Sequence, residues 1–210
     1  MLLDLIDKSL KKLENFDPEM LVKELAANGF LPVDVGAKDI RDKKGTGYYC
    51  WFPGFIELLK PKLIVELGGA MGVGSICMLN SNYKDFKLFS ITLEEGGKEF
   101  CYVEKGKYPN FHPVIGDDLD LNSWPKGLDL SKTDLWFIDS LHTEDQLRKE
   151  LELYKPFFKK GAIILFDDIY QNEGMENVWN ELESLLPIKE KHSLSLHWDG
   201  FGCVQIGEKE

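Results

Sequence analysis

The sequence predicts an α/β protein built around a doubly wound, mostly parallel sheet of seven strands. After Pro61, short apolar runs alternate with amphipathic stretches of helical period, which is the pattern of parallel strands joined by covering helices. Near the C-terminal end, two more apolar runs surround Asp199-Gly200, a pair that favours a tight antiparallel hairpin. No internal repeat or low-complexity segment interrupts this order, so we expect one domain.

The composition narrows the classes of partner and compartment. The chain carries 36 acidic and 25 basic side chains over 210 residues, a formal net charge of −11. Because nucleic-acid backbones are bound by surplus Lys and Arg, this balance argues against a nucleic-acid partner. No uncharged run approaches the roughly 20 residues that cross a bilayer, so no membrane association is expected. The four cysteines stand far apart without a CxxC pair, which favours buried, reduced thiols and a cytoplasmic location.

The first sixty residues predict a helical extension. Apolar residues recur at helical spacing up to Leu25, and Asp17-Pro18 is typical of the cap and first turn of a second helix. We expect residues 1–60 to be part of the same domain as residues 61–210. The amphipathic face of the extension could cover the sheet, lie over a ligand or pair with a second subunit in a homodimer.

A polar, glycine-containing stretch follows at residues 33–53 and ends in an aromatic cluster. Its composition predicts a loop or lid that leads into a short helix near residues 55–59. Tyr48, Tyr49 and Trp51 could stack on a substrate or cover a ligand cation through cation–π attraction. A packing role explains each of them equally well.

The remaining elements are predicted from their apolar runs and helical spacing. Strands are expected at residues 63–67, 88–93, 112–115, 135–138, 162–166, 193–198 and 201–206. Helix-like stretches lie between them at residues 74–80, 98–105, 144–154 and 175–185. Right-handed crossovers between parallel strands then place helices on both faces of the sheet.

The first of these strands runs into a glycine turn, Glu66-Leu67-Gly68-Gly69-Ala70-Met71-Gly72. Ligands of doubly wound sheets bind at the carboxyl ends of the strands, and glycines let the backbone approach a ligand closely. Gly68 and Gly72 give a GxxxG spacing, whereas a dinucleotide turn needs GxGxxG. The acid before the turn suits a ligand with an ammonium group. A turn that merely packs against a neighbouring helix would show the same pattern.

Acids also follow the second and third strands. Glu94 stands about 25 residues past the glycine turn, where an acid accepts hydrogen bonds from a ribose diol. Asp117 and Asp118 follow the third strand. Glu94 could instead begin the next helix, where negative charge is favourable. Acids at three consecutive strand ends nevertheless favour a nucleoside ligand.

The fourth and fifth strands deliver three more carboxylates, those of Asp139, Asp167 and Asp168. Adjacent strands would bring them together, and carboxylates that converge repel one another unless a cation or proton intervenes. Oxygen ligands suit a hard divalent cation such as Mg²⁺. His142 follows one turn after Asp139 and could take a proton from a substrate hydroxyl. A capping role for Asp168 and a structural one for His142 stay open. No role is assigned to the other histidines, His112, His192 and His197.

Together these motifs resemble the motif series of class I S-adenosylmethionine (SAM) dependent O-methyltransferases, whose fold is Rossmann-like. The most specific part is residues 137–142 with residues 159–169, which are similar to the metal-dependent catechol-type and macrolide-sugar O-methyltransferases. In the macrolide-sugar enzymes, an Asp with a His three positions later pairs with two adjacent acids on the next strand. Catechol-type enzymes have an amide where Asp168 stands, so this departure favours the sugar or polyol branch.

The resemblance implies a role for each of these residues. It implies a SAM site made by Glu66, Gly68, Gly69, Gly72, Glu94, Asp117 and Asp118. It implies a site for Mg²⁺ or another divalent cation made by Asp139, Asp167 and Asp168, with His142 as the catalytic base. The expected activity is transfer of a methyl group from SAM to a hydroxyl oxygen of a small-molecule substrate. The alternatives are a catalytically inactive SAM-binding protein and, less favoured, a nicotinamide-dependent oxidoreductase.

Overall fold

The computed structural model describes residues 1–29, 40–41, 47–93 and 106–207. Its strands are β1 (Leu63–Leu67), β2 (Lys87–Thr92), β3 (Phe111–Ile115), β4 (Leu135–Ile138), β5 (Ile163–Phe166), β6 (Ile188–Leu194) and β7 (Phe201–Ile206). Its α-helices are α1 (Leu2–Glu14), α2 (Pro18–Ala27), α4 (Gly47–Leu59), α5 (Val73–Leu79), α6 (Glu144–Tyr154) and α7 (Glu173–Leu185). Short 3₁₀ turns follow at Leu121–Ser123, Leu130–Lys132 and Lys155–Phe157.

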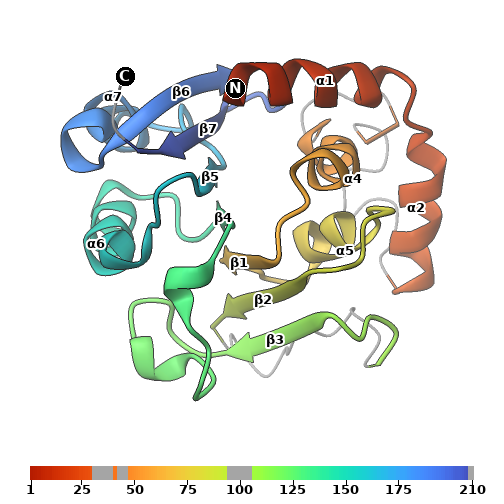
Figure 1. Cartoon of the computed structure of the whole chain (residues 1–210), viewed down its shortest axis with the longest axis horizontal. Coiled ribbons are helices and arrows are strands. Elements are labelled where there is room, and N and C mark those ends of the chain that lie inside the picture. The colour runs from red at the N-terminus through yellow and green to blue at the C-terminus, as the bar shows by residue number, and fades with distance from the viewer. Residues whose placement is uncertain (30–39, 42–46, 94–105, 208–210) are drawn as a thin grey trace.

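All seven described strands form one sheet in the order β3-β2-β1-β4-β5-β7-β6 (Figure 1). Strands β3, β2, β1, β4 and β5 run parallel to one another, and β7 runs antiparallel to both β5 and β6. This confirms the predicted doubly wound, mostly parallel sheet with an antiparallel C-terminal strand. Strand β7 is inserted beside β5, so β6 forms the edge.

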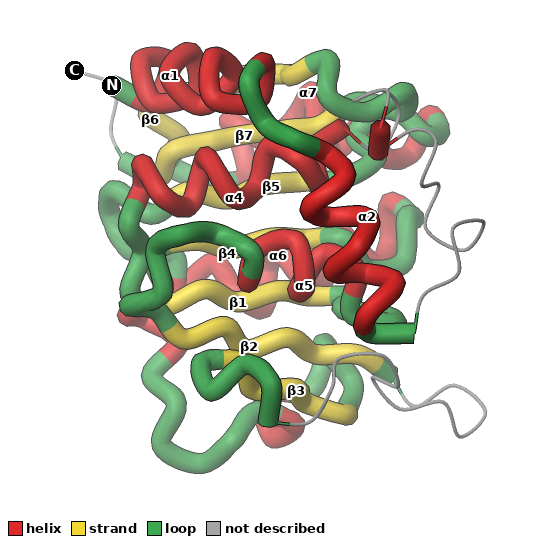
Figure 2. The backbone as a smooth tube through the Cα atoms, turned by 90° about the vertical axis from the view of Figure 1, so that its right-hand side faces the viewer, coloured by secondary structure: helices red, strands yellow, loops and turns green. Residues whose placement is uncertain are grey.

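Helices cover both faces of the sheet (Figure 2). The extension α1 and α2 lies with α4 and α5 on one face, and α6 and α7 lie on the other. Adjacent strand residues alternate between two cores, so that Phe137 packs on the first face and Trp136 on the second. Burial on both faces explains why the central strands are continuous apolar runs. None of the helices in the described part of the chain is both long and apolar enough to cross a membrane.

Four predictions about local structure need correction or fall outside the described residues. The helix expected near residues 55–59 begins at Gly47, because the aromatic cluster is its buried first half. The strand expected at residues 193–198 is instead β6, which ends at Leu194. Residues 195–200 therefore form a longer loop between β6 and β7, and the expected short hairpin around Asp199-Gly200 is wrong, although a turn does close between His197 and Gly200. The helix expected at residues 98–105 lies outside the described residues.

The N-terminal extension covers the sheet face, as one of its predicted roles required. As predicted, Pro18 begins α2, whose cap Asp17 accepts a hydrogen bond from the Glu19 N–H at 3.0 Å. The side chains of Leu2, Ile6, Leu21 and Leu25 belong to the same core as the aromatic residues of α4. The start of α1 is also bound to strand β6. Glu190 on β6 accepts hydrogen bonds from the backbone N–H groups of Leu2 and Leu3, both at 3.2 Å.

The contact between α1 and α4 includes one buried polar pair within an otherwise apolar core. Trp51 is fully buried and stacks on Phe55, with ring centroids 4.1 Å apart. Its indole N–H donates to the Ser9 hydroxyl at 2.7 Å, and that hydroxyl donates in turn to the Ile6 carbonyl. The pair therefore satisfies the one polar atom of a large buried side chain.

Replacing Ser9 with Ala is expected to lower the free energy of unfolding by roughly 1–3 kcal/mol, because it leaves the Trp51 N–H buried without an acceptor. Urea denaturation followed by tryptophan fluorescence measures this loss. Ser184→Ala is the matched control, since the Ser184 hydroxyl is exposed and bonds only the Glu181 carbonyl of its own helix. If the two variants lose equal stability, the buried hydrogen bond between Ser9 and Trp51 contributes no more than an exposed one.

Candidate active site

The parallel strands β1, β4 and β5 end at the same edge of the sheet. Leu67 pairs with Ile138, and Ile138 pairs with Phe166. The next residue of each strand continues the ladder, because Asp139 N–H donates to the Leu67 carbonyl at 2.9 Å and Asp167 N–H to the Ile138 carbonyl at 3.0 Å. Register alone therefore brings the glycine turn and the carboxylates to one edge.

The glycine turn is packed tightly against the end of β4. Gly68 has a φ of +87°, and a Cβ there would lie 2.0 Å from the Asp139 carbonyl oxygen. The N–H groups of Gly68 and Gly69 both donate to the Ile91 carbonyl, at 3.0 and 2.9 Å. Gly72, with a φ of +93°, precedes α5. Glycine is required at Gly68 by this close approach and by the left-handed φ, whatever ligand the turn holds.

The Glu66 carboxylate lies beneath the turn. The side chain is 1% exposed and accepts hydrogen bonds from the hydroxyls of Ser75 and Ser90. A Cβ at Gly74 would come within 2.5 Å of its Oε1 atom. Burial raises the pKa of Glu66, while the two hydroxyls oppose that rise. The acid thus ties β1, β2 and α5 together at the turn.

The acids after β3 differ in their surroundings. Asp117 is exposed and accepts a hydrogen bond from the Leu119 N–H at 2.8 Å. Asp118 is half-buried, and the Gln146 amide donates both to it and to Glu150, at 3.0 Å each. Burial raises the pKa of Glu150 to about 8, with the negative charge of Asp118 adding to the rise. Asp118 is therefore held against α6, and Asp117 is the acid open to solvent. Glu94 lies outside the described residues.

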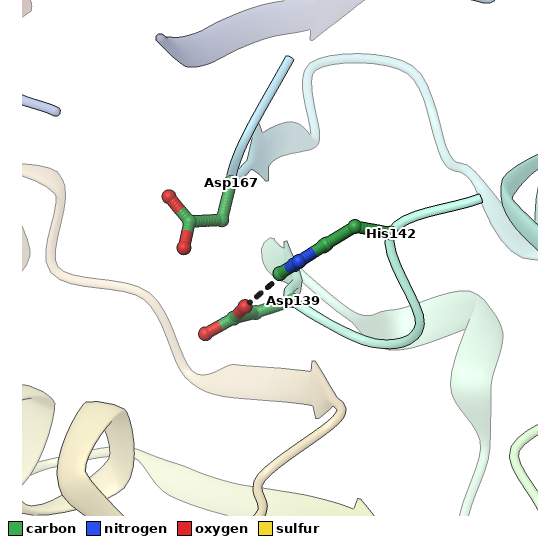
Figure 3. A group of neighbouring side chains, drawn as sticks. All are labelled: Asp139, His142 and Asp167. Atoms are coloured by element: carbon green, nitrogen blue, oxygen red, sulfur yellow. Dashed lines mark hydrogen bonds and ion pairs between the residues drawn. The ribbon is translucent and has the colours of Figure 1, made fainter. Parts of the chain in front are cut away.

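Asp139, His142 and Asp167 lie close together, and Asp139 contacts the ring of His142 (Figure 3). His142 Nε2 lies 3.2 Å from Asp139 Oδ1, and His142 Nδ1 lies 3.0 Å from Asp168 Oδ2. Both ring nitrogens of this histidine thus contact carboxylates. Burial raises the pKa of Asp139 well above its usual value, and the charges of Glu66 and Asp168 add to that rise.

The adjacent acids of β5 are almost fully buried. Asp167 is 4% exposed and Asp168 is 5% exposed. The Tyr48 hydroxyl donates to Asp167 Oδ2 at 3.0 Å, and the Gln171 amide donates to Asp168 Oδ2 at 2.8 Å. The Oδ1 atom of each acid is buried without a hydrogen bond from the described residues. Asp168 also has a φ of +54°, a conformation that non-glycine residues seldom adopt.

Two residues of the cluster were missed by sequence reasoning. His197 reaches the acids from the β6–β7 loop, with its Nδ1 atom 2.8 Å from Asp168 Oδ1 and 3.9 Å from Asp167 Oδ1. Burial lowers the pKa of His197, but the two carboxylates outweigh burial and raise it overall. Tyr48 is 2% exposed and stacks on Phe201, so its ring packs in the core while its hydroxyl serves Asp167. No spacing in the sequence links either residue to the acids.

The donor atoms fit a divalent cation. They form two groups, each with its ligand atoms within 4.8 Å of one another, and the groups share Asp167. One adds Asp139 and His142, and the other adds Asp168 and His197. Within the described chain no group contains all three predicted acids, because His142 lies between Asp139 and Asp168. The Oδ1 atoms of Asp167 and Asp168 lie near His197 but accept no hydrogen bond from the described residues, so they are the buried acceptors that a cation would satisfy.

A family model described as a methyltransferase domain matches residues 65–169. This segment is half of the chain and runs from β1 to the residue after the acid pair. The chain therefore belongs to this methyltransferase family, which confirms the predicted class of enzyme. A comparison with curated protein sequences gave no match.

Solved structures with the same fold include several methyltransferases. The SAH-bound methyltransferase PaMTH1 of Podospora anserina is 14% identical, with a TM-score of 0.67 over 98% of this chain and 96% of its own. A putative caffeoyl-CoA O-methyltransferase of Staphylococcus aureus is 15% identical, with a TM-score of 0.61 over 90% and 99%. The O-methyltransferase TomG of Streptomyces achromogenes, in complex with SAM, is 16% identical, with a TM-score of 0.60 over 89% and 88%. At these identities the likeness establishes the shared fold.

Replacing Glu150 with Gln is expected to make the free energy of unfolding less dependent on pH. Between about pH 4.5 and about pH 8 the folded protein keeps a proton on Glu150 that the unfolded chain has lost. The contribution of Glu150 to stability therefore falls as pH rises through this window. Gln cannot ionise, so the variant should gain on the natural protein as pH rises, by an amount on the order of a few kcal/mol.

Urea denaturation across this pH window measures that difference. Glu152→Gln is the control, because Glu152 is an exposed carboxyl on the same helix. A difference between Glu150→Gln and the natural protein that stays constant with pH contradicts the raised pKa.

Proposed function

We propose that this methyltransferase transfers a methyl group from SAM to a hydroxyl oxygen of a small molecule, assisted by a divalent cation and by His142. The observation that carries the proposal is the buried pair Asp167 and Asp168, whose Oδ1 atoms accept no hydrogen bond from the described residues. Only strand β4 lies between this pair and the glycine turn. A turn that binds a methyl donor and acids that bind a substrate through a cation are then neighbours at one sheet edge. A small-molecule acceptor is supported by neighbours of the same fold whose names specify O-methyltransferases.

For the cofactor, we propose that the turn from Gly68 through Gly69 to Gly72 holds the methionine part of SAM. The buried Glu66 carboxylate would act from beneath, by fixing the turn and placing negative charge below the ligand's ammonium group. Glu94 stays the proposed ribose ligand. The GxxxG spacing and the complex of TomG with SAM support this assignment.

The two acids after β3 are the proposed residues near the adenine of SAM, and the structure gives them different surroundings. Asp117 is exposed at the strand end and is the better candidate to approach the adenine. Asp118 is bonded to Gln146, so it would contribute mainly by holding the strand end against α6. Both assignments, like the homodimer, stay predictions.

For the chemical step, Asp139, Asp167 and Asp168 would hold the cation. A bound divalent cation lowers the pKa of a coordinated hydroxyl and holds its oxygen in place. His142 would accept the hydroxyl proton, and Asp139 would orient its ring and stabilise the imidazolium that forms. Because both ring nitrogens contact carboxylates here, one of these contacts has to open before His142 can accept a proton.

Calorimetric titration with SAM and with NADH tests the cofactor assignment. We expect SAM to bind and NADH to give no saturable heat, because the turn lacks the spacing of a dinucleotide site. Binding of NADH in preference to SAM would support the oxidoreductase alternative and sink the proposal. Binding of SAM without methyl transfer to any acceptor would support an inactive SAM-binding protein.

Transfer of a labelled methyl group to a panel of sugars, polyols and catechols tests the chemical step. Asp139→Ala and His142→Ala are each expected to lower turnover by roughly 100-fold or more, while SAM binding persists. His192→Ala is the control, since His192 lies on edge strand β6 beside Glu190 and outside both donor groups. Unchanged turnover in both Asp139→Ala and His142→Ala would contradict the proposed cation site and the proposed base.

A further inference from the structure

His197 is a nitrogen donor at the cation site that the motifs of the two central strands do not supply. It lies in the loop between β6 and β7, far along the sequence from the strands that carry the acids. Its side chain is 13% exposed, and its ring meets the Tyr48 ring edge-on, with centroids 5.5 Å apart. The same Tyr48 donates to Asp167. The histidine is therefore part of the buried cluster rather than a surface neighbour of it.

The backbone holds this loop against the segment that follows the acid pair. Ile169 N–H donates to the Gly200 carbonyl at 3.3 Å, and Tyr170 N–H donates to the Asp199 carbonyl at 2.7 Å. Within the loop, Gly200 N–H donates to the His197 carbonyl at 3.2 Å, and Gly200 takes a φ of +80°. The positions of His197 and of the acids are thus fixed relative to each other by main-chain bonds.

The distances around His197 are those of ligands on one ion. Ligand atoms about 2.1 Å from an octahedral ion lie roughly 3 Å apart when adjacent and roughly 4 Å apart when opposite. Here His197 Nδ1 is 2.8 Å from Asp168 Oδ1 and 3.9 Å from Asp167 Oδ1. Those two oxygens are also the buried atoms that have no hydrogen bond from the described residues.

The ring of His197 also has a tautomer that suits a metal ligand. When Nδ1 is unprotonated, it can accept the hydrogen bond from the Asp199 N–H at 3.3 Å. Metal-binding histidines are neutral, with the ligating nitrogen unprotonated. At 3.3 Å the hydrogen bond from Asp199 is long and weak, so it competes little with an ion beside Asp168 for the lone pair of this nitrogen.

We propose that His197 is a ligand of the cation together with Asp167 and Asp168, and that this nitrogen makes the site prefer a first-row transition ion over Mg²⁺. Imidazole nitrogen suits such ions, whereas carboxylates alone suit Mg²⁺. The inference rests on the cation of the proposed function and adds to it a ligand and a metal preference.

Titration of the chelator-treated full chain with CoCl₂ and with MgCl₂, by calorimetry and by the visible spectrum of Co²⁺, tests this proposal. We expect Co²⁺ to bind more tightly than Mg²⁺ to the natural protein. His197→Ala should weaken Co²⁺ binding by about tenfold more than it weakens Mg²⁺ binding, and should alter the Co²⁺ spectrum. His192→Ala should match the natural protein in all three measurements. Thermal unfolding in chelator checks that each variant is folded.

His197→Gln is measured beside the alanine variant, because it keeps a polar side chain should the smaller residue fail to fold. It should likewise lose the preference for Co²⁺. If both variants bind Co²⁺ like the natural protein, His197 is no ligand, although a cation held by the acids alone would still stand. If the natural protein binds neither ion, the histidines neutralise the acids without metal, and the inference falls. SAM titration of the same samples reports separately on the cofactor site.

Discussion

Repulsion among the carboxylates at the ends of β4 and β5 is the constraint around which this site is built. Two like charges about 4 Å apart repel by roughly 4 kcal/mol at an effective dielectric constant of about 20, and here burial and that repulsion raise the pKa of Asp139 and of Asp167. The fold nevertheless places Asp139, Asp167 and Asp168 at one edge, because parallel register leaves their strands no other place to end. Two histidines and one tyrosine hydroxyl contact these acids. They offset part of the repulsion and still leave two buried oxygens without a hydrogen bond from the described residues, which is an arrangement that a ligand stabilises.

The N-terminal extension contributes to this site although it carries none of the motifs. Helix α4 brings Tyr48 to Asp167, and burial with the nearby acids raises the pKa of Tyr48 well above its usual value, so the hydroxyl stays a donor. Helix α4 is in turn packed beneath α1 through Trp51 and Ser9. The extension is therefore part of the structure that positions an acid.

What the sequence could predict depended on whether the signal was local. The ends of β1, β4 and α6 are as expected to the residue, because strands buried on both faces are bounded sharply and Thr143 caps α6 through its own side chain. The acids at the strand ends follow from register in the same way. His197 could not be predicted, because Asp199-Gly200 favours a tight turn locally while tertiary bonds to residues 169–170 open the segment into a loop. The buried orientation of the Glu66 side chain could not be predicted either, since it depends on a hydrogen bond from Ser90 of the neighbouring strand β2.

The capping of α1 by Glu190 has a consequence for the order of folding. The hydrogen-bond partners are separated by 188 and 187 positions, so the first turn of the first helix is completed by the outermost strand of the sheet. Contacts of such high sequence separation form late, because closing the chain costs entropy before the contact stabilises it. Helix α1 is therefore expected to dock among the last elements, after β6 has paired with β7. Helix α1 would then pack against α4, which carries Tyr48, only after the sheet is complete.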